Sequence, residues 1–384
     1  MKPVESVDNA LGLQTLPREI LLMLPKFLDN LEDYVNLSST SRLLRCCMAA
    51  ADPHTILHLA WASSRIFFRP SPFFLCSAVA AQIGVWARES DANEVELVAG
   101  MPRGLDHLMD LALRHRQIGL TMERIRELYA MRFSVINPIS DLIDKCVGKQ
   151  WYSIPNFWSG GASDAATIRT NEEILIYVLA AYGELFGPDF EPLFDPALSS
   201  RKRLRIETRL EFVKYCIPDI HTERYQHDLQ LPDGSYDPRR TIVVVEGGPY
   251  DDGKDQPQYY ADDHAVALLW VMRSSRWRPH WIKARQDAGA KPDFANKLEE
   301  RDNPDRDWRQ DLLENVMQCQ GMEALGMIRP GTEIAERYKP KIREWREKIE
   351  RLEVEPPKIE VSGYETHEYP DLYGDLSVCT SDWW

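Results

Sequence analysis

The chain has 384 residues, 44% of them hydrophobic, and a formal net charge of -14 at pH 7. That length and apolar content allow a well-buried core, with material for two or three domains. The acidic balance disfavours binding to duplex nucleic acid, because a surface that follows phosphates needs an excess of Lys and Arg. No apolar run approaches the roughly 20 residues of a membrane-spanning helix, and the start of the chain lacks signal-peptide features. We therefore expect a cytoplasmic or nuclear protein whose partners are proteins, not nucleic acid or membrane.

Seven cysteines are scattered along the chain without C-x-x-C spacing. An odd number cannot pair fully within one chain, and this pattern is typical of reduced, structural thiols. The neighbouring Cys46 and Cys47 are accordingly predicted to be packed thiols and not a redox switch.

Residues 1–11 are expected to be disordered, and signals for three short helices follow between Leu16 and Cys47. Pro17 suits the first turn of a helix, where its missing amide costs nothing, and Glu19 suits the positive helix end. The first helix is predicted to carry an apolar stripe made of Ile20, Leu24, Phe27, Leu28 and Leu31.

Asn30 with Asp33 restarts a helix, and Ser39 or Thr40 can cap a third. Three helices in so short a segment cannot bury all of their apolar surface among themselves, since chains below about 40 residues rarely hold a core alone. Some of the leucines must therefore be covered by the remainder of the chain or by a partner protein.

The most specific pattern of the chain consists of Leu16, Pro17, Glu19, Ile20, Leu21, Leu24 and Leu28, followed by Leu37, Ser38, Ser39, Thr40 and Arg42. These residues resemble an F-box, over about a tenth of the chain. The resemblance implies a three-helix unit, residues 12–50, that docks on the adaptor subunit of an SCF (cullin-RING) ubiquitin ligase and through it on the cullin. The rest of the chain would hold a protein substrate. By the same resemblance, the adaptor-contacting residues are Leu16, Pro17, Ile20, Leu24, Leu28 and Leu37.

Three positions depart from the family's pattern. Tyr34 stands where a leucine is usual, Ser41 replaces a common cysteine, and Leu43 stands near a frequent aromatic residue. Such changes can weaken adaptor binding. Because the remainder carries no leucine-rich, WD40 or kelch signature, the chain resembles the divergent F-box proteins of filamentous fungi.

Two alternatives stay open. The first is a helical interaction protein without a ligase, whose F-box-like segment belongs to its own core; coverage of Ile20, Leu24 and Leu28 by residues beyond 50 would favour it. The second is a helical enzyme that uses His and Asp side chains between residues 221 and 264.

The region from 51 to 354 is predicted to be an irregular multi-helix, substrate-recognition domain with few or no strands, so that the fold as a whole is mainly α. Helix starts are predicted at Asp52 with Pro53, Ser71 with Pro72, Asn137 with Pro138, Asp91 with Glu94, and Thr170 with Glu173. The segment after Thr170 is apolar almost all round until Gly187 and Pro188, which predicts a buried core helix.

The later part of the chain is more varied. Residues 219–258 are predicted to form a long loop interrupted by a strand at 241–245, and helices should resume near Asp262. After Pro340 comes a stripe that predicts a helix packed on the main domain, made of Ile342, Trp345, Ile349 and Leu352. The tail, 355–384, is acidic and aromatic, and is expected to be disordered or to dock through its aromatic side chains.

Several polar groupings contain residue types that can form a site. His221, Glu223, His227 and Asp228 lack the spacing of H-E-x-x-H, while Asp262, Asp263 and His264 suit a helix cap. Gly247 and Gly248 predict a turn and not a phosphate loop. We therefore predict no catalytic residue, no metal site and no cofactor.

A basic run extends from Arg201 to Arg209. A nuclear-import or phosphate-binding patch is one interpretation. Its interspersed apolar residues favour a solvated helix face instead.

Overall fold

The computed structural model describes residues 12–62, 72–140, 172–216, 308–325, 333–356, 358–361 and 364–367. Over these residues the chain is mainly helical, which confirms the predicted fold class. The strands described are β1 (Lys358–Val361) and β2 (Tyr364–His367), which form an antiparallel hairpin near the start of the predicted tail. The predictions for 1–11, for the loop 219–258 with its strand, and for the helix near Asp262 lie outside the described residues.

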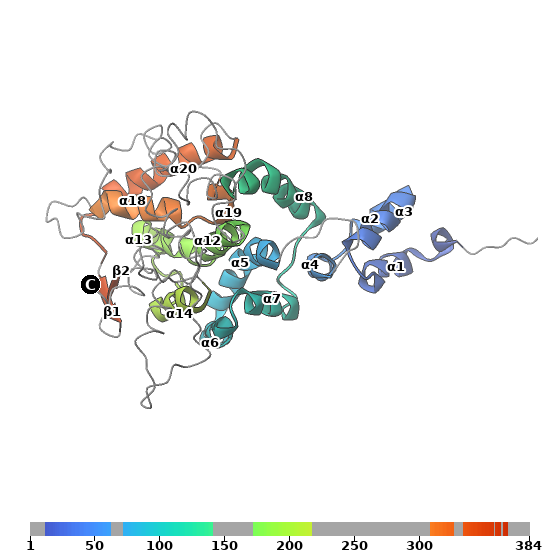
Figure 1. The fold of residues 1–384 in the computed structure, drawn as a ribbon, viewed down its shortest axis with the longest axis horizontal. Coiled ribbons are helices and arrows are strands. Elements are labelled where there is room, and N and C mark those ends of the chain that lie inside the picture. The colour runs from blue at the N-terminus through green and yellow to red at the C-terminus, as the bar shows by residue number, and fades with distance from the viewer. Residues whose placement is uncertain are drawn as a thin grey trace, which may run out of the picture.

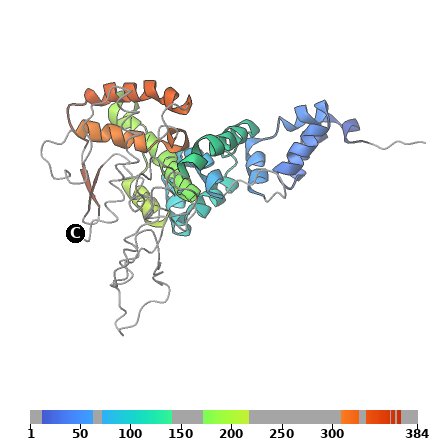
Figure 2. The same ribbon diagram turned by 45° about the horizontal axis from the view of Figure 1, so that its top comes forward.

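Residues 12–50, here called the N-terminal unit, lie at one end of the molecule (Figures 1 and 2). The unit consists of η1 (Leu13–Thr15), α1 (Arg18–Leu21), η2 (Leu24–Phe27), α2 (Leu31–Thr40) and α3 (Arg42–Met48). Next comes α4 (Pro53–Trp61), which begins at Pro53 as predicted. Because α4 contacts α2 and η2 as well as α5 and α7, it joins the unit to the rest of the protein.

The other helices form the body. They are α5 (Pro72–Glu89), α6 (Asp91–Gly100), η3 (Met101–Arg103), α7 (Leu105–Arg114), α8 (Met122–Met131), the π-helical η4 (Arg132–Ile136), α12 (Glu172–Phe186), η5 (Gly187–Asp189), α13 (Glu191–Phe194), η6 (Pro196–Leu198), α14 (Ile206–Cys216), α18 (Trp308–Gln318), α19 (Gly321–Ala324) and α20 (Glu333–Glu350). At its centre α5 packs along α12; α7 lies on α5, α19 on α12, and α18 on α20 (Figure 1). The body is therefore built around the α5 and α12 pair.

The predicted core helix is α12. It ends at Phe186, where Gly187 and Pro188 were expected to stop it, and its Tyr182 is fully buried. Two glycines allow other segments to approach its end closely. A Cβ on Gly183 would collide with the backbone of Gly321, and one on Gly187 with the carbonyl oxygen of Cys319.

An ion pair is buried between α5 and η5. Arg88 donates to Asp189 Oδ1 through both Nε (2.9 Å) and Nη2 (2.6 Å), and Nη2 also donates to the carbonyl of Leu185 (2.7 Å). The two side chains are only 7% and 5% exposed. Burial raises the pKa of Asp189, and the neighbouring Arg88 opposes that rise.

The late helix confirms the predicted stripe. In α20, Ile342 is 1%, Trp345 5% and Ile349 1% exposed, and Leu352 packs on the same cluster just beyond the helix end. The helix begins earlier than predicted, however, and contains Pro340 in its interior. The late helix thus packs on the body, as expected.

Helix α6 begins at Asp91, which confirms the helix start predicted there, but Asp91 and Glu94 do not form the expected capping box. Ser90 caps α6, accepting a backbone hydrogen bond of 3.1 Å, while Glu94 is fully buried. Its Oε1 accepts from the backbone N–H of Arg205 and from the hydroxyl of Thr208, both at 2.7 Å. Glu94 thus makes a tertiary contact with Arg205 and with Thr208 of α14 instead of a cap on its own helix.

The basic run 201–209 is not a solvated helix face. Its first residues are not helical, because α14 starts only at Ile206. Lys202 bonds Asp91 at 2.5 Å, and Arg209 is only 2% exposed. The run therefore packs against the body, where Lys202 and Arg205 form ion pairs with acidic side chains of α6.

No new helix starts at Asn137 and Pro138. The π-turn η4 extends α8, and the chain continues helically through residue 140. Proline in an α-helix interior lacks an amide and clashes with the carbonyl four residues earlier. A wider π-turn just before Pro138 relieves that conflict, because the amide of Asn137 bonds the carbonyl of Arg132, five residues back.

Candidate partner-binding surface

The first predicted helix is broken. Instead of one amphipathic helix, the segment forms the short α1, a turn, and the 3-10 helix η2 with Pro25 in its first turn. Within an α-helix Pro25 would lack an amide and press on the carbonyl of Leu21. Pro25 itself is buried, so the break is a packed feature of the unit. The stripe predicted on a single helix is consequently divided between two directions.

The second and third helices are held by caps. The Asn30 side chain accepts from the amide of Asp33 at 3.0 Å, as predicted. The third helix is capped by Ser41, which accepts a backbone hydrogen bond of 3.2 Å, and not by Ser39 or Thr40. Those two hydroxyls instead donate back to the carbonyls of Val35 and Leu37 within α2.

A small N-terminal cluster holds the three helices together. It consists of buried Leu21, Leu44 and Cys47, with the half-buried Leu24 and Leu37 packed against it. Leu24 and Leu37 also pack on the main apolar cluster of the body. So few buried side chains supply little apolar area, which makes the unit dependent on its attachment to α4.

Tyr34, one of the departures from the F-box pattern, anchors the unit to the body. Its ring is 5% exposed and belongs to the main apolar cluster, together with Leu31 and Met48. Its hydroxyl donates to the carbonyl of Met48 at 2.7 Å, and burial raises the pKa of the phenol. Tyr34 thus fastens α2 to the end of α3 that faces the body.

The six predicted contact residues fall into two groups. Leu16 (37% exposed), Pro17 and Ile20 (45% exposed) lie on the surface. Leu24, Leu28 and Leu37 are half-buried and pack against the chain's own clusters. The condition that would have favoured a wholly internal role, coverage of Ile20, Leu24 and Leu28 together, is therefore not met.

Sequence reasoning did not assign a partner contact to several other exposed apolar residues. They are Leu13 (45% exposed), Leu22 (38%), Met23 (45%), Phe27 (72%) and Leu43 (41%). Phe27 was placed on the predicted stripe, but the break at Pro25 turns it outward. That proline was the signal in the sequence that could have indicated this.

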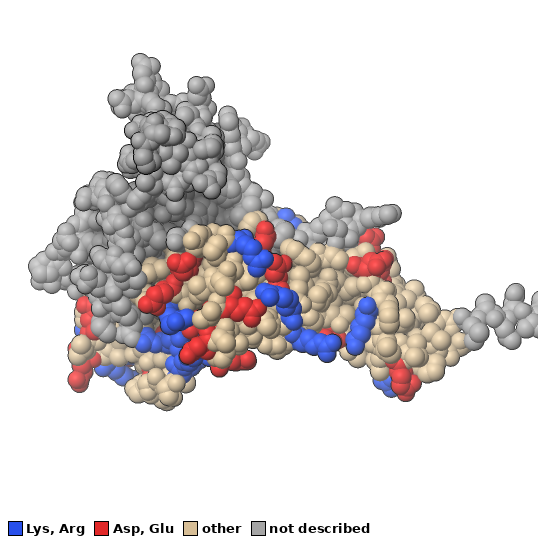
Figure 3. All heavy atoms as spheres, turned by 90° about the horizontal axis from the view of Figure 1, so that it is seen from below, with Lys and Arg blue, Asp and Glu red and all other residues tan. Residues whose placement is uncertain are grey.

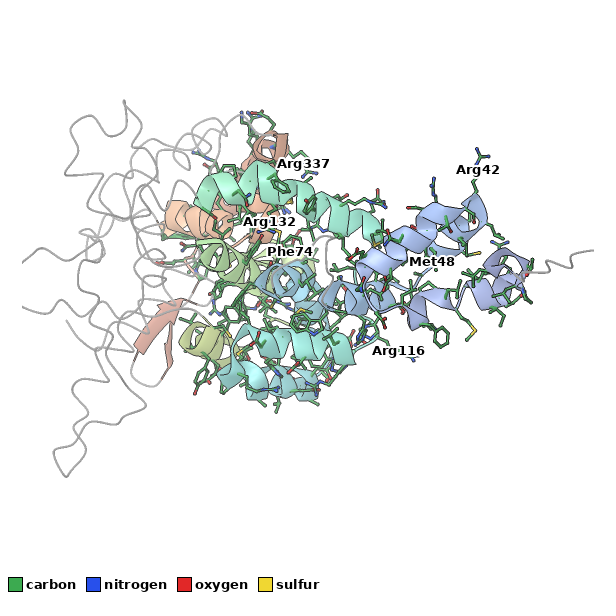
Figure 4. All side chains as sticks on the ribbon, turned by 45° about the vertical axis from the view of Figure 1, so that its right-hand side comes forward. Arg42, Met48, Phe74, Arg116, Arg132 and Arg337 are labelled. Carbon is green, nitrogen blue, oxygen red and sulfur yellow. The ribbon has the colours of Figure 1, made fainter. Side chains whose placement is uncertain are left out.

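Together, the exposed apolar residues of the unit are Leu13, Leu16, Ile20, Leu22, Met23, Phe27 and Leu43. They make up half of all exposed large hydrophobic residues in the described part of the chain. On the face seen in Figure 3, few Lys, Arg, Asp or Glu side chains cover this end of the molecule. Figure 4 shows Arg42 at the far end of α3, pointing away from the body, and Met48 at the near end. This concentration of exposed apolar side chains makes the unit the candidate surface for a partner.

The groupings at 221–228, 247–248 and 262–264 lie outside the described residues. Among the residues that are described, no group of three or more His, Cys, Asp or Glu side chains could hold a metal ion. Within the same ranges, every helix is too short or too polar to span a bilayer.

The described cysteines are thiols and do not form disulfides. Cys46 is exposed, while Cys47, Cys76, Cys216 and Cys319 are buried. Burial raises the pKa of Cys216 to about 12. A thiol with so high a pKa stays protonated and is a poor nucleophile. Among these residues the packed-thiol interpretation holds for every cysteine except the exposed Cys46.

In comparisons with known proteins, no family model, no curated protein and no solved structure matches the chain.

Proposed function

We propose that the N-terminal unit docks on the adaptor subunit of an SCF-type ubiquitin ligase and that the body holds a protein substrate beside it. The observation that carries the proposal is the exposure of Leu16, Ile20 and Phe27, which the chain's own core leaves uncovered. The F-box-like residues supply the identity of the partner, and the exposed side chains supply the contact. The chain would raise the effective concentration of substrate near the ligase, with no catalytic residue of its own.

The size of the effect can be estimated from apolar anchors in other interfaces. Truncating a central anchor to alanine commonly costs about 2 kcal/mol or more of binding free energy. Because about 1.4 kcal/mol changes an affinity tenfold, removing Leu16 and Ile20 together should weaken adaptor binding by roughly a hundredfold or more. Both side chains are exposed in the free protein, so its stability should change far less.

Neighbouring residues provide a matched control. Ile20 is 45% exposed, whereas Leu21 is 1% exposed and lies in the N-terminal cluster. Capture of the purified adaptor and a thermal melt should be measured on Leu16→Ala/Ile20→Ala and on Leu21→Ala. The double variant should lose capture and keep its melting temperature; Leu21→Ala should lower the melting temperature. Wild-type protein that captures no adaptor, or a double variant that captures it fully, would refute the assignment.

A second candidate function is supported by the same exposed residues. They could bind a protein other than the SCF adaptor, which would make the chain a helical interaction protein without a ligase. Adaptor capture distinguishes the two candidates. Loss of a different, directly identified partner from the Leu16→Ala/Ile20→Ala variant would establish the second.

A further inference from the structure

A pocket of about 320 Å³ opens on the body, far along the chain from the N-terminal unit. Its wall is made by the end of α12 and by η5, α13, α18 and α20, with Arg124 contributed by α8. Two glycines, Gly183 and Gly187, belong to the wall, and their lack of a side chain lets the backbone of Gly321 and Cys319 approach closely. The volume lies at the lower end of the range for binding pockets, about 300 to 1,000 Å³.

Most charged groups of the wall already have partners. The carboxylate of Glu191 pairs with Arg201 at 2.9 Å, and that of Glu184 accepts from the amide of Met322 at 3.1 Å. The guanidinium of Arg124 pairs with Glu127 at 3.1 Å. The charges of Glu191 and Arg124 are thus met by opposite charges of the chain, and the carboxylate of Glu184 is held by a backbone amide.

Lys341 is different. Its ammonium lies over the rings of Trp345 (4.8 Å to the centroid) and Tyr338 (5.4 Å), and the side chain is exposed. No carboxylate pairs with it among the described residues. The two rings are almost fully buried, so they form a fixed platform beneath the ammonium. An ammonium held in one place without an acidic partner is ready to accept an anion.

The surroundings favour the same ligand charge. Arg337 lies one helical turn before Lys341 on α20, is exposed, and so adds a second positive charge on that face (Figure 4). Apolar wall residues such as Phe190, Phe194 and Val316 can pack against the non-polar part of a bound side chain.

We infer that this pocket is the substrate-binding site, and that it takes an acidic peptide segment whose Asp or Glu carboxylate pairs with Lys341. The inference rests on the proposed function, which supplies a protein substrate. The carboxylate would meet the ammonium from the open side, since Tyr338 and Trp345 occupy the other. Neighbouring residues of the segment would lie against the aromatic wall.

Selection from a random library of short peptides on immobilised full-length protein tests the inference. Wild-type protein should enrich Asp or Glu at one fixed position. Lys341→Glu should lose that enrichment and Lys341→Arg should keep it. Arg343→Glu serves as the matched control, because it makes the same change of charge on an exposed residue of α20 outside the pocket wall. An enriched peptide should bind Lys341→Glu at least about tenfold more weakly than it binds the control variant. Its binding to the wild-type protein should weaken as salt is added.

Two results would overturn the inference: no acidic enrichment by the wild-type protein, or the same enrichment by Lys341→Glu when its thermal melt shows it folded. The selection contains no adaptor, so its outcome is independent of adaptor capture. Acidic enrichment through Lys341 together with no adaptor capture would sink the ligase role and leave the pocket as a peptide site. Adaptor capture without acidic enrichment would remove the pocket and leave the ligase role.

Discussion

The N-terminal unit and the body both carry apolar side chains on their helices, but the body covers them more completely. In α20 the apolar stripe is almost completely buried, with Trp345 5% and Ile349 1% exposed. In α1 and η2, Ile20 is 45% and Phe27 72% exposed. The body closes around one large apolar cluster, whereas the unit has a separate cluster of only three fully buried residues.

This contrast shows that an apolar stripe predicts that the helix face will be covered. The stripe does not tell whether the same chain or a partner covers it. Burial of apolar area stabilises a helix whether the covering surface belongs to the same chain or to a partner. Helices α5 and α12 cover each other's apolar surface within the body. The unit, which lies at one end of the molecule (Figure 2), leaves part of its apolar surface exposed. Each of the following changes tests one side of the contrast.

The largest effect is expected at Trp345 of α20. Replacing it with Ala should lower the free energy of unfolding by about 3 to 5 kcal/mol, because the change removes a buried indole and leaves a cavity. Chemical denaturation measures the loss. Val354, which is 77% exposed, provides the control: Val354→Ala should leave the unfolding free energy unchanged within about 0.5 kcal/mol. An unaltered midpoint for Trp345→Ala would show that α20 does not belong to the core.

A comparable loss is expected at the buried ion pair. Arg88→Ala should cost about 3 to 5 kcal/mol of folding stability, since it leaves the carboxylate of Asp189 buried without its main partner. Arg124→Ala is the matched control, because it breaks an exposed pair with Glu127 that is worth no more than about 1 kcal/mol. Equal denaturation midpoints for the two variants would contradict the structural role assigned to Arg88.

Sequence patterns located the elements better than they located the contacts between them. The stripe of α20, the stop at Gly187 and the cap at Asn30 depend on neighbours within a few residues, so the sequence contains the whole signal. Glu94 could not be assigned in this way, because its partner Thr208 is distant in the chain. The long-range contact competed with the local cap and replaced it.

The candidate surface was predictable in part for the same reason. The F-box-like pattern drew attention to Leu16 and Ile20, which are exposed. It also included Leu24 and Leu28, which face the chain's own clusters, and it left out Phe27. Periodicity assigns residues to a shared face only while the helix is continuous, and the helix here ends before Pro25. Lys341 escaped notice because its partners are the faces of two rings.

A smaller effect is expected where the unit meets the body. Tyr34→Phe keeps the buried ring but removes the hydroxyl that donates to Met48. The loss should be about 1 kcal/mol, the net worth of a typical hydrogen bond together with a carbonyl left less satisfied. Thermal unfolding measures it. Tyr129→Phe is the control on a tyrosine whose side chain is 42% exposed. A loss no larger than that of the control would mean that this bond does not fasten α2 to α3.

The smallest effect on stability, and the sharpest contrast between the two regions, is expected at Phe27. The side chain is 72% exposed, so Phe27→Ala should change the unfolding free energy by no more than about 0.5 kcal/mol. Phe74, 1% exposed in the body, provides the comparison, and Phe74→Ala should cost about 3 to 5 kcal/mol. If Phe27 contacts the partner, its loss should appear instead in adaptor binding, as a change of about 2 kcal/mol or more. Thermal melts and adaptor capture, measured on both variants, separate folding from docking. A strongly destabilised Phe27→Ala protein would show that the ring is needed by the chain's own core, and unchanged capture would remove Phe27 from the interface.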